Sequence, residues 1–288
     1  MSRNIYGNTV SPGHPYWDYS EENDNNYVGI ESITKVDNTS VKLKQASLRI
    51  FDFFSTINQF LGLLMVILVG YFYGNIDGSY LWKDINKKSL TNIEERAYLN
   101  LHGLAITVGL VFFHGEGILI NRFFRHEPKY IFKLYGVIFN MISLACGVFA
   151  LAAFIIFSNK QIEYQYYSFQ FWLLLGVLAI YVITTIIYVF VFTFPRLPKN
   201  IRLSIKPYAN AMTLISFILS SVYSILSNTL YINKYLNKKD TAICNNDENC
   251  VTKFQYIMNF GLSATVLYAI VVVIQTCKKS WSRKLKDL

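Results

Sequence analysis

The chain alternates between long runs of apolar residues and short polar segments. Each run is continuous rather than alternating with a period of two, which favours helices over the strands of a barrel. A helix of about 20 apolar residues is long enough to cross the hydrocarbon core of a membrane. The pattern therefore predicts an all-α integral membrane protein, a six-helix transmembrane bundle with its helices near residues 53–73, 99–120, 131–157, 169–194, 209–231 and 256–276.

Polar segments flank the six runs. Residues 1–48 are rich in Asn, Tyr, Ser and Gly, and we expect them to form a disordered tail, because they have too little apolar surface to offset the entropy of ordering. They show no basic start followed by a short apolar core, so no cleavable signal peptide is predicted. The predicted organisation is a tail over 1–48, a six-helix membrane domain over 49–277 and a basic tail over 278–288.

The net charge of +9 over 288 residues agrees better with a membrane protein than with a nucleic-acid binder, and we expect no nucleic-acid partner. Positive residues flank alternate helix ends, as they do on the cytoplasmic side of a membrane. This pattern predicts that both termini are cytoplasmic, without indicating the plasma membrane or an endomembrane. The basic residues concerned are Lys42, Lys44, Arg49, Arg122, Arg125, Lys129, Lys133, Arg196, Lys199, Arg202, Lys206, Lys278, Lys279, Arg283, Lys284 and Lys286.

Two of the four cysteines lie close together in the last outer loop. Cys244 and Cys250 flank the segment NNDEN, and a disulfide between them would suit an oxidising compartment. Free thiols are an equally good interpretation. A metal site is disfavoured because two isolated cysteines lack further ligands, so no metal is predicted.

The second apolar run and its exit read HGLAITVGLVFFHGEGILINRFFR from His102 to Arg125. Further on come the segments YSFQFW, at residues 167–172, and FTFP, at residues 192–195, followed by Arg202 and Pro207. The spacing of these motifs resembles that of the cytochrome b561 family over roughly residues 50–280. The resemblance implies a six-helix membrane protein in which four histidines hold two haems.

Only one of the four ligand histidines is retained at the positions that the resemblance implies. His102 occupies the second-helix position, but Gln170 stands in the fourth helix, where the family has Tyr-Ser-Leu-His-Ser-Trp. These two positions hold the outer haem in the family. The cytoplasmic haem is held by positions that fall on Gly136, with Tyr135 as the nearest substitute, and on Ala209.

These replacements change the expected cofactor chemistry. Haem iron takes axial donors such as His, Met, Cys thiolate or Tyr. Glutamine is a poor donor, and glycine and alanine offer no side-chain donor at all. We therefore expect no cofactor, with haem b as the cofactor of the alternative in which ligation is unconventional. Taken without the resemblance, His102 is a hydrogen-bonded packing residue.

Basic residues gather at the exit of the second helix. The resemblance implies that Arg122, Arg125 and Lys133 help to hold ascorbate on the cytoplasmic face, and an anionic lipid headgroup would suit them equally well. The same charges also have a simpler role as a topology signal. Both interpretations stay open.

Three further ionisable residues fall in or beside the helices. Glu116 is expected to face the bundle, protonated or hydrogen-bonded. His114 lies two residues away and therefore on another face of the helix. Asp52 is expected to be a helix cap or an interface residue.

The sequence favours a protein that keeps the six-helix bundle and has lost its electron path. Such a protein would act as a structural, assembly or anion- or lipid-binding component of the lipid bilayer, and a homodimer or other membrane proteins are candidate partners. The alternative is an enzyme, a transmembrane ascorbate-dependent oxidoreductase that reduces ferric iron or monodehydroascorbate, with His102 and Tyr135 as unconventional ligands. A transporter is disfavoured, since the helices lack paired Gly/Pro breaks.

Overall fold

The computed structural model describes residues 27–76, 80, 92–123, 129–160, 169–193, 198–233 and 248–278. The chain divides into two units, Met1–Ala46 and Ser47–Leu288. Regular structure in the described residues is entirely helical. The elements in chain order are α1 (Tyr27–Asn75), α2 (Asn92–Ala105), η1 (Ile106–Phe113), α3 (His114–Phe123), α4 (Lys129–Lys160), α5 (Phe169–Ile187), η2 (Tyr188–Thr193), α6 (Lys199–Tyr231) and α7 (Glu248–Cys277).

Six helical spans are long and apolar enough to cross a membrane, and each one overlaps a predicted run, which confirms the six-helix membrane architecture. The second span combines α2, η1 and α3, and the fourth combines α5 with part of η2. The spans are Arg49–Asn75, Arg96–Ile120, Lys133–Ser158, Phe169–Phe190, Ser204–Tyr231 and Thr252–Cys277.

Helix α1 begins well before the predicted membrane boundary. It starts at Tyr27, whereas the sequence predicts a tail that extends to residue 48; disorder of the tail stays a prediction. No proline interrupts residues 27–75, and extending an existing helix avoids the cost of nucleating a new one. Asp52 consequently lies inside a helix and caps nothing; its backbone carbonyl accepts a hydrogen bond from Thr56. Residues 1–26 lie outside the described residues.

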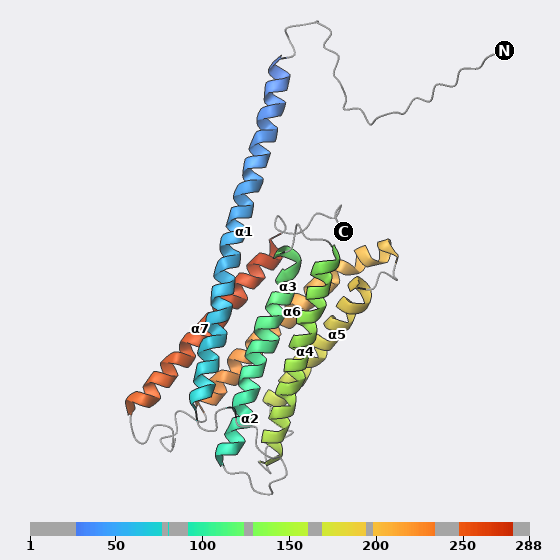
Figure 1. The fold of residues 1–288 in the computed structure, drawn as a ribbon. Helices are drawn as coiled ribbons and strands as arrows, with labels where there is room; N and C mark the ends of the chain where they lie inside the picture. The colour runs from blue at the N-terminus through green and yellow to red at the C-terminus, as the bar shows by residue number, and fades with distance from the viewer. Residues whose placement is uncertain are drawn as a thin grey trace, which may run out of the picture. The chain divides into compact units, whose positions relative to one another are not determined.

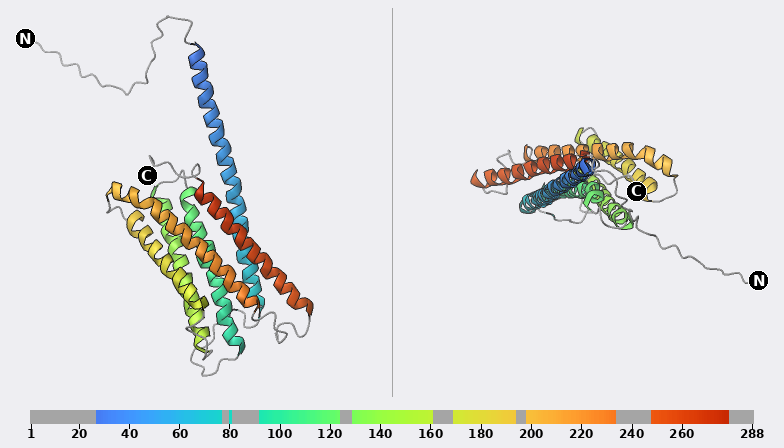
Figure 2. Two further views of the ribbon diagram at one scale, coloured as in Figure 1. Left: turned by 180° about the vertical axis from the view of Figure 1, so that it is seen from behind. Right: turned by 90° about the horizontal axis from the view of Figure 1, so that it is seen from above.

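Within the second unit, the helices after α1 run side by side as a bundle (Figure 1). Seen from above, α6 and α7 lie in one row, and α3 and α4 lie in front of it (Figure 2). The segment α2–η1–α3 contacts α4, α6 and, through α3, α7, while α5 packs between α4 and α6. This central segment carries both His102 and Glu116, so it contributes to polar sites at both ends of the bundle.

The bundle buries polar side chains and exposes apolar ones. Phe60, Phe169 and Phe260 are exposed large side chains on three different helices, whereas His102, Glu116 and many serine, threonine and asparagine side chains are buried. This distribution is expected in lipid, because exposed apolar groups meet hydrocarbon and buried polar groups must bond across helices. The burial pattern thus supports the membrane assignment independently of hydropathy.

Helix η1 is a π-helical segment in the middle of the second span. At its centre, Gly109 faces α4 so closely that a Cβ atom would lie 2.2 Å from the Cβ of Cys146. The hydroxyl of Ser143 on α4 donates to the Gly109 carbonyl at 2.8 Å. Small residues permit this approach of helix backbones in membranes, and the contact fixes the register of His102 relative to α4.

Candidate functional site

His102 is fully buried near the beginning of the second span. Its Nδ1 lies 2.8 Å from the carbonyl oxygen of Ala150 on α4, and its Nε2 lies 3.2 Å from the hydroxyl of Tyr223 on α6. A carbonyl only accepts, so Nδ1 carries the proton and Nε2 accepts from Tyr223. An imidazole that donates through Nδ1 to a backbone carbonyl is oriented as metal-bound histidines are.

Tyr223 links His102 to the residue at the opposite ligand position. Its side chain is fully buried, and its hydroxyl lies beside Gln170 on α5 and Ser227 on α6. The amide nitrogen of Gln170 donates to the Ser227 hydroxyl at 3.0 Å. One tyrosine hydroxyl therefore stands between the two side chains that would face an outer haem.

The residues at this outer position do not fit a haem held by two axial ligands. His102 has a suitable orientation, but Tyr223 takes its Nε2 lone pair. Gln170 offers an amide in place of an imidazole, and that amide is hydrogen-bonded to Ser227. Phe154 packs against the imidazole with ring centroids 4.9 Å apart, so aromatic side chains cover this region.

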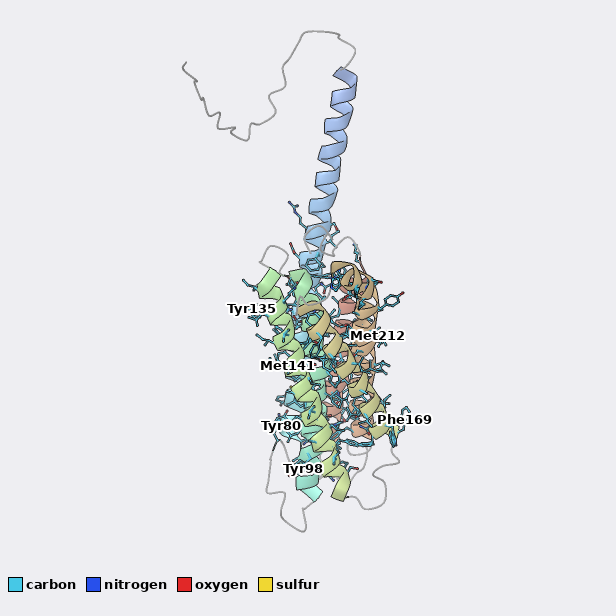
Figure 3. All side chains as sticks on the ribbon, turned by 90° about the vertical axis from the view of Figure 1, so that its right-hand side faces the viewer. Tyr80, Tyr98, Tyr135, Met141, Phe169 and Met212 are labelled. Atoms are coloured by element: carbon cyan, nitrogen blue, oxygen red, sulfur yellow. The ribbon has the colours of Figure 1, made fainter. Side chains whose placement is uncertain are left out.

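The cytoplasmic ligand positions also lack donors. A Cβ atom on Gly136 would lie 2.3 Å from the hydroxyl of Tyr188 of η2, so this tyrosine fills the place of a larger side chain. Ala209 is buried and carries only a methyl group. Tyr135 is 42% exposed on the outward side of α4 (Figure 3), which argues against it as a substitute ligand. These residues do not fit a haem either.

A hydrogen-bond network surrounds His102. The Tyr73 hydroxyl of α1 donates to Asn228 Oδ1 at 2.6 Å, and the Tyr231 hydroxyl donates to Asn100 Oδ1 at 2.7 Å. The Asn228 amide nitrogen also reaches Thr107 and Ser224. We call this end of the bundle the His102 half, which contains Tyr73, Asn100, His102, Thr107, Tyr223, Ser224, Ser227, Asn228 and Tyr231.

A second polar group lies toward the other end of the bundle. Glu116 is buried, as expected, and accepts hydrogen bonds from Gln59 and Tyr268. His114 points away from it and contacts the ring of Tyr181 on α5, at a centroid distance of 4.6 Å. The two ionisable residues thus occupy different faces of α3, as their spacing predicts. We call this end the Glu116 half, which contains Asn58, Gln59, His114, Glu116, Tyr181, Tyr268 and Gln275.

The basic exit has a structural role at Arg122. The guanidinium group donates from Nη1 to the Lys278 carbonyl at 3.1 Å and from Nη2 to the Thr276 carbonyl, so it caps the C-terminal end of α7. Lys133 is half-buried near the beginning of α4. Arg125 lies outside the described residues, as does Cys244, so the disulfide with Cys250 stays a prediction.

The predictions from the sequence do not include the polar face of α6, although the sequence carries a signal for it. Serines recur at helical spacing within an otherwise apolar span, at positions 216, 220, 224 and 227, and all four are buried. Asn58 and Tyr268 are distant in the sequence, so no local pattern connects them with Glu116. Only packing brings them together with Glu116.

The family model described as eukaryotic cytochrome b561 matches residues 101–232, which contain His102, Gly136, Gln170 and Ala209.

Relatives from animals and plants match at low identity. A putative transmembrane ascorbate-dependent reductase CYB561 homolog of Caenorhabditis elegans is 24% identical over 246 residues, or 83% of this chain and 87% of that protein. The transmembrane ascorbate-dependent reductase CYB561 of Homo sapiens is 24% identical over 155 residues, so the match spans 54% of this chain and 57% of the human protein. Transmembrane ascorbate ferrireductase 1 of Arabidopsis thaliana is 25% identical over 203 residues, or 70% and 78% of the two chains.

The match to the family model, the relatives and the six-helix bundle agree with one another. The chain is similar to the cytochrome b561 family over residues 101–232.

Proposed function

We propose that this protein is a member of the family that binds no haem and serves as a structural or assembly component of the membrane. The hydroxyl of Tyr223, which lies 3.2 Å from His102 Nε2 and beside Gln170, carries this proposal. This hydroxyl lies between the side chains at the two proposed ligand positions and forms hydrogen bonds there. Buried polar networks of this kind hold transmembrane helices together.

The cytoplasmic end supports the same proposal. Gly136 and Ala209 have no donor atoms, and the Tyr188 hydroxyl lies where a side chain on Gly136 would extend. Electron transfer across a hydrocarbon core of about 30 Å needs more than one relay. A chain without ligands at the inner position therefore lacks the second relay that the electron path requires.

Haem quantitation on the purified full chain tests this proposal. The protein is produced in cells supplied with a haem precursor, purified in mild detergent and measured by absorbance and by pyridine extraction. We expect far less than one haem per chain and no absorbance change on adding ascorbate. A stoichiometry of two haems per chain would overturn the proposal.

A second candidate is a transmembrane ascorbate-dependent reductase with unconventional ligation. The names of the relatives favour it, and so does the orientation of His102. His114 strengthens the case, because it is a fully buried imidazole whose ring nitrogens make no hydrogen bond of normal geometry with a described residue. It follows His102 by twelve residues, or about 18 Å of helix. If this candidate holds, haem b would supply one-electron transfer, and His102→Ala would abolish the ascorbate-reducible absorbance.

Lipid binding at the basic exit is part of the proposed role. With Arg122 held by the carbonyls of α7, we propose that Arg125 and Lys133 meet anionic headgroups or a small anion such as ascorbate. Vesicles of anionic phosphatidylglycerol should raise the thermal midpoint more than vesicles of phosphatidylcholine. The double variant Arg125→Gln/Lys133→Gln should lose this difference, and an unchanged difference would remove the role.

The proposed topology places both termini on the cytoplasmic side. Cys277 is an exposed free thiol at the end of α7, which makes it a natural reporter. A membrane-impermeant maleimide should label Cys277 in inside-out vesicles and leave it unlabelled in intact cells, with Cys277→Ser as the control for background. Labelling in intact cells would reverse the orientation.

A further inference from the structure

Glu116 is a buried carboxyl group away from the positions that the family uses for haem. Its two carboxyl oxygens are contacted from two other helices: the Gln59 amide nitrogen of α1 lies 2.6 Å from Oε2, and the Tyr268 hydroxyl of α7 lies 3.2 Å from Oε1. An ionisable group inside a membrane is costly, and it usually marks a functional site. The site therefore lies among α1, α3 and α7.

Asn58 gives an independent sign that this site takes a ligand. Its side chain is fully buried beside the Tyr268 hydroxyl. Neither its amide oxygen nor its amide nitrogen makes a hydrogen bond of normal geometry with a described residue. The Tyr268 hydroxyl can meet at most one of these two groups, whereas buried amides are nearly always fully satisfied, and an incompletely paired one inside a membrane is more costly still. A bound group at this position would remove the cost.

The backbone near Glu116 supplies a carbonyl oxygen, and two glycines leave space for the side chain of Tyr268. The Phe112 carbonyl lies 3.2 Å from the Tyr268 hydroxyl, near the end of η1, and π-helical segments are frequent at functional sites. Gly62 and Gly115 both face the ring of Tyr268, and a Cβ atom on Gly115 would lie 2.4 Å from its hydroxyl oxygen. Two glycines thus leave the room that the tyrosine needs to reach Glu116.

The candidate ligand atoms of this site are oxygens, and the Glu116 carboxylate is the group among them that carries a charge. Oxygen ligands suit hard cations. A monovalent cation would neutralise an ionised Glu116, whereas a divalent one would leave a net charge in the membrane. We propose that Glu116, Asn58, Tyr268 and the Phe112 carbonyl form an intramembrane site for a sodium ion.

A polar side chain lies between this site and the end of α7. Gln275 follows Tyr268 by seven residues, which is two helical turns on the same face. It is fully buried, and its amide atoms also lack hydrogen bonds of normal geometry with the described part of the chain. A cation that enters from the Cys277 end of the bundle would contact the Gln275 amide on its way to Glu116. The proposal does not depend on whether the protein binds haem.

Thermal unfolding of the purified full chain tests the site. The midpoint is compared in sodium chloride and in the same concentration of N-methyl-D-glucamine chloride, which keeps ionic strength constant. We expect sodium to raise the midpoint by about 5 °C, because a ligand that binds only the folded state stabilises it. Equal midpoints for the parent protein would overturn the proposal.

Three variants locate the effect. Glu116→Gln and Tyr268→Phe each keep the shape of the side chain and remove an oxygen donor or its charge, so each should lose most of the sodium shift. Asn58→Leu provides a third test if either of these variants fails to fold. Thr184→Val is the matched control, because Thr184 is buried on α5 and its hydroxyl donates to the Tyr181 carbonyl of the same helix; it should keep the full shift. A Glu116→Gln protein that responds to sodium as the parent does would exclude the site.

Discussion

The two ends of the bundle differ in how completely their buried polar side chains are hydrogen-bonded. In the His102 half, Tyr73, His102 and Asn228 find partners on other helices. In the Glu116 half, the carboxyl group is paired, but several of its neighbours make no hydrogen bond of normal geometry with the described residues: Asn58, His114 and Gln275. The same chain therefore contains a satisfied polar core and an incompletely satisfied one.

This difference separates a structural role from a binding role. A complete network in lipid links helices and rigidifies them, which suits the structural role proposed for this end of the bundle. An incomplete group costs stability unless something else meets it. The His102 half is consequently the place to look for helix packing, and the Glu116 half is the place to look for a ligand.

The largest expected effect comes from restoring an outer ligand pair. The double variant Gln170→His/Tyr223→Ala places a second imidazole opposite His102 and removes the hydroxyl between them. We expect it to gain roughly one haem per chain, since two imidazoles are suitable axial donors. Absorbance and haem extraction measure the gain. Tyr223→Ala alone is the control, and a double variant without haem would show that more than these two side chains prevents binding.

The next effect is the loss of a partner in the His102 half. Asn228→Leu removes the acceptor of the Tyr73 hydroxyl and should lower the free energy of unfolding by about 1–2 kcal/mol. Reversible unfolding in mixed micelles measures it. The matched control is Thr229→Val, because the hydroxyl of the neighbouring Thr229 donates to the Ile225 carbonyl of its own helix, and its removal should change the free energy of unfolding little. A neutral Asn228→Leu would show that the network contributes no stability.

A smaller effect of opposite sign is expected in the Glu116 half. Without sodium, Asn58→Leu replaces an incompletely paired buried amide by an apolar side chain of similar size, so the free energy of unfolding should stay constant or rise by about 1 kcal/mol. The same unfolding assay measures it. A loss as large as that of Asn228→Leu would remove the distinction between the two halves.

The smallest effect concerns the end of α7. Arg122→Met leaves the Thr276 and Lys278 carbonyls without the guanidinium group and should cost about 0.5–1 kcal/mol, since the contact is partly exposed. Hydrogen exchange over the last turn of α7 should become faster. Lys133→Met, which removes a positive charge on another helix, is the control and should leave that exchange unchanged. If both variants accelerate the exchange equally, the loss of positive charge explains the effect and the loss of the cap does not.

The sequence predicts the architecture well because hydrophobic length is a local property. All six spans fall where the apolar runs place them, and the motifs around His102 and Gln170 indicate the family. Helix α1 begins before the first apolar run, since a polar composition does not stop a helix that already has a nucleus and contains no proline. The separation of His114 from Glu116 follows from helical spacing alone.

The polar sites were less predictable. Arg122 was expected at an anion site, yet it caps α7, because the carbonyls of a helix end far along the chain lie within reach of its guanidinium group. Tyr135 was the nearest substitute for a ligand by position, yet its side chain faces outward on α4. Asn58 and Tyr268 lie 210 residues apart in the sequence, so no local pattern connects them.

The sequence alone determined that this protein spans a membrane with six helices, and it predicts that imidazoles are missing at positions where the cytochrome b561 family has them. Composition and spacing suffice for both, because each depends on residues within one helix. The tertiary structure decided which groups replace the missing ligands and which stay unpaired, as shown by Tyr223 beside His102 and by Asn58 beside Tyr268. These pairings depend on how helices cross, which small residues such as Gly109 and Gly115 permit by letting other helices approach closely.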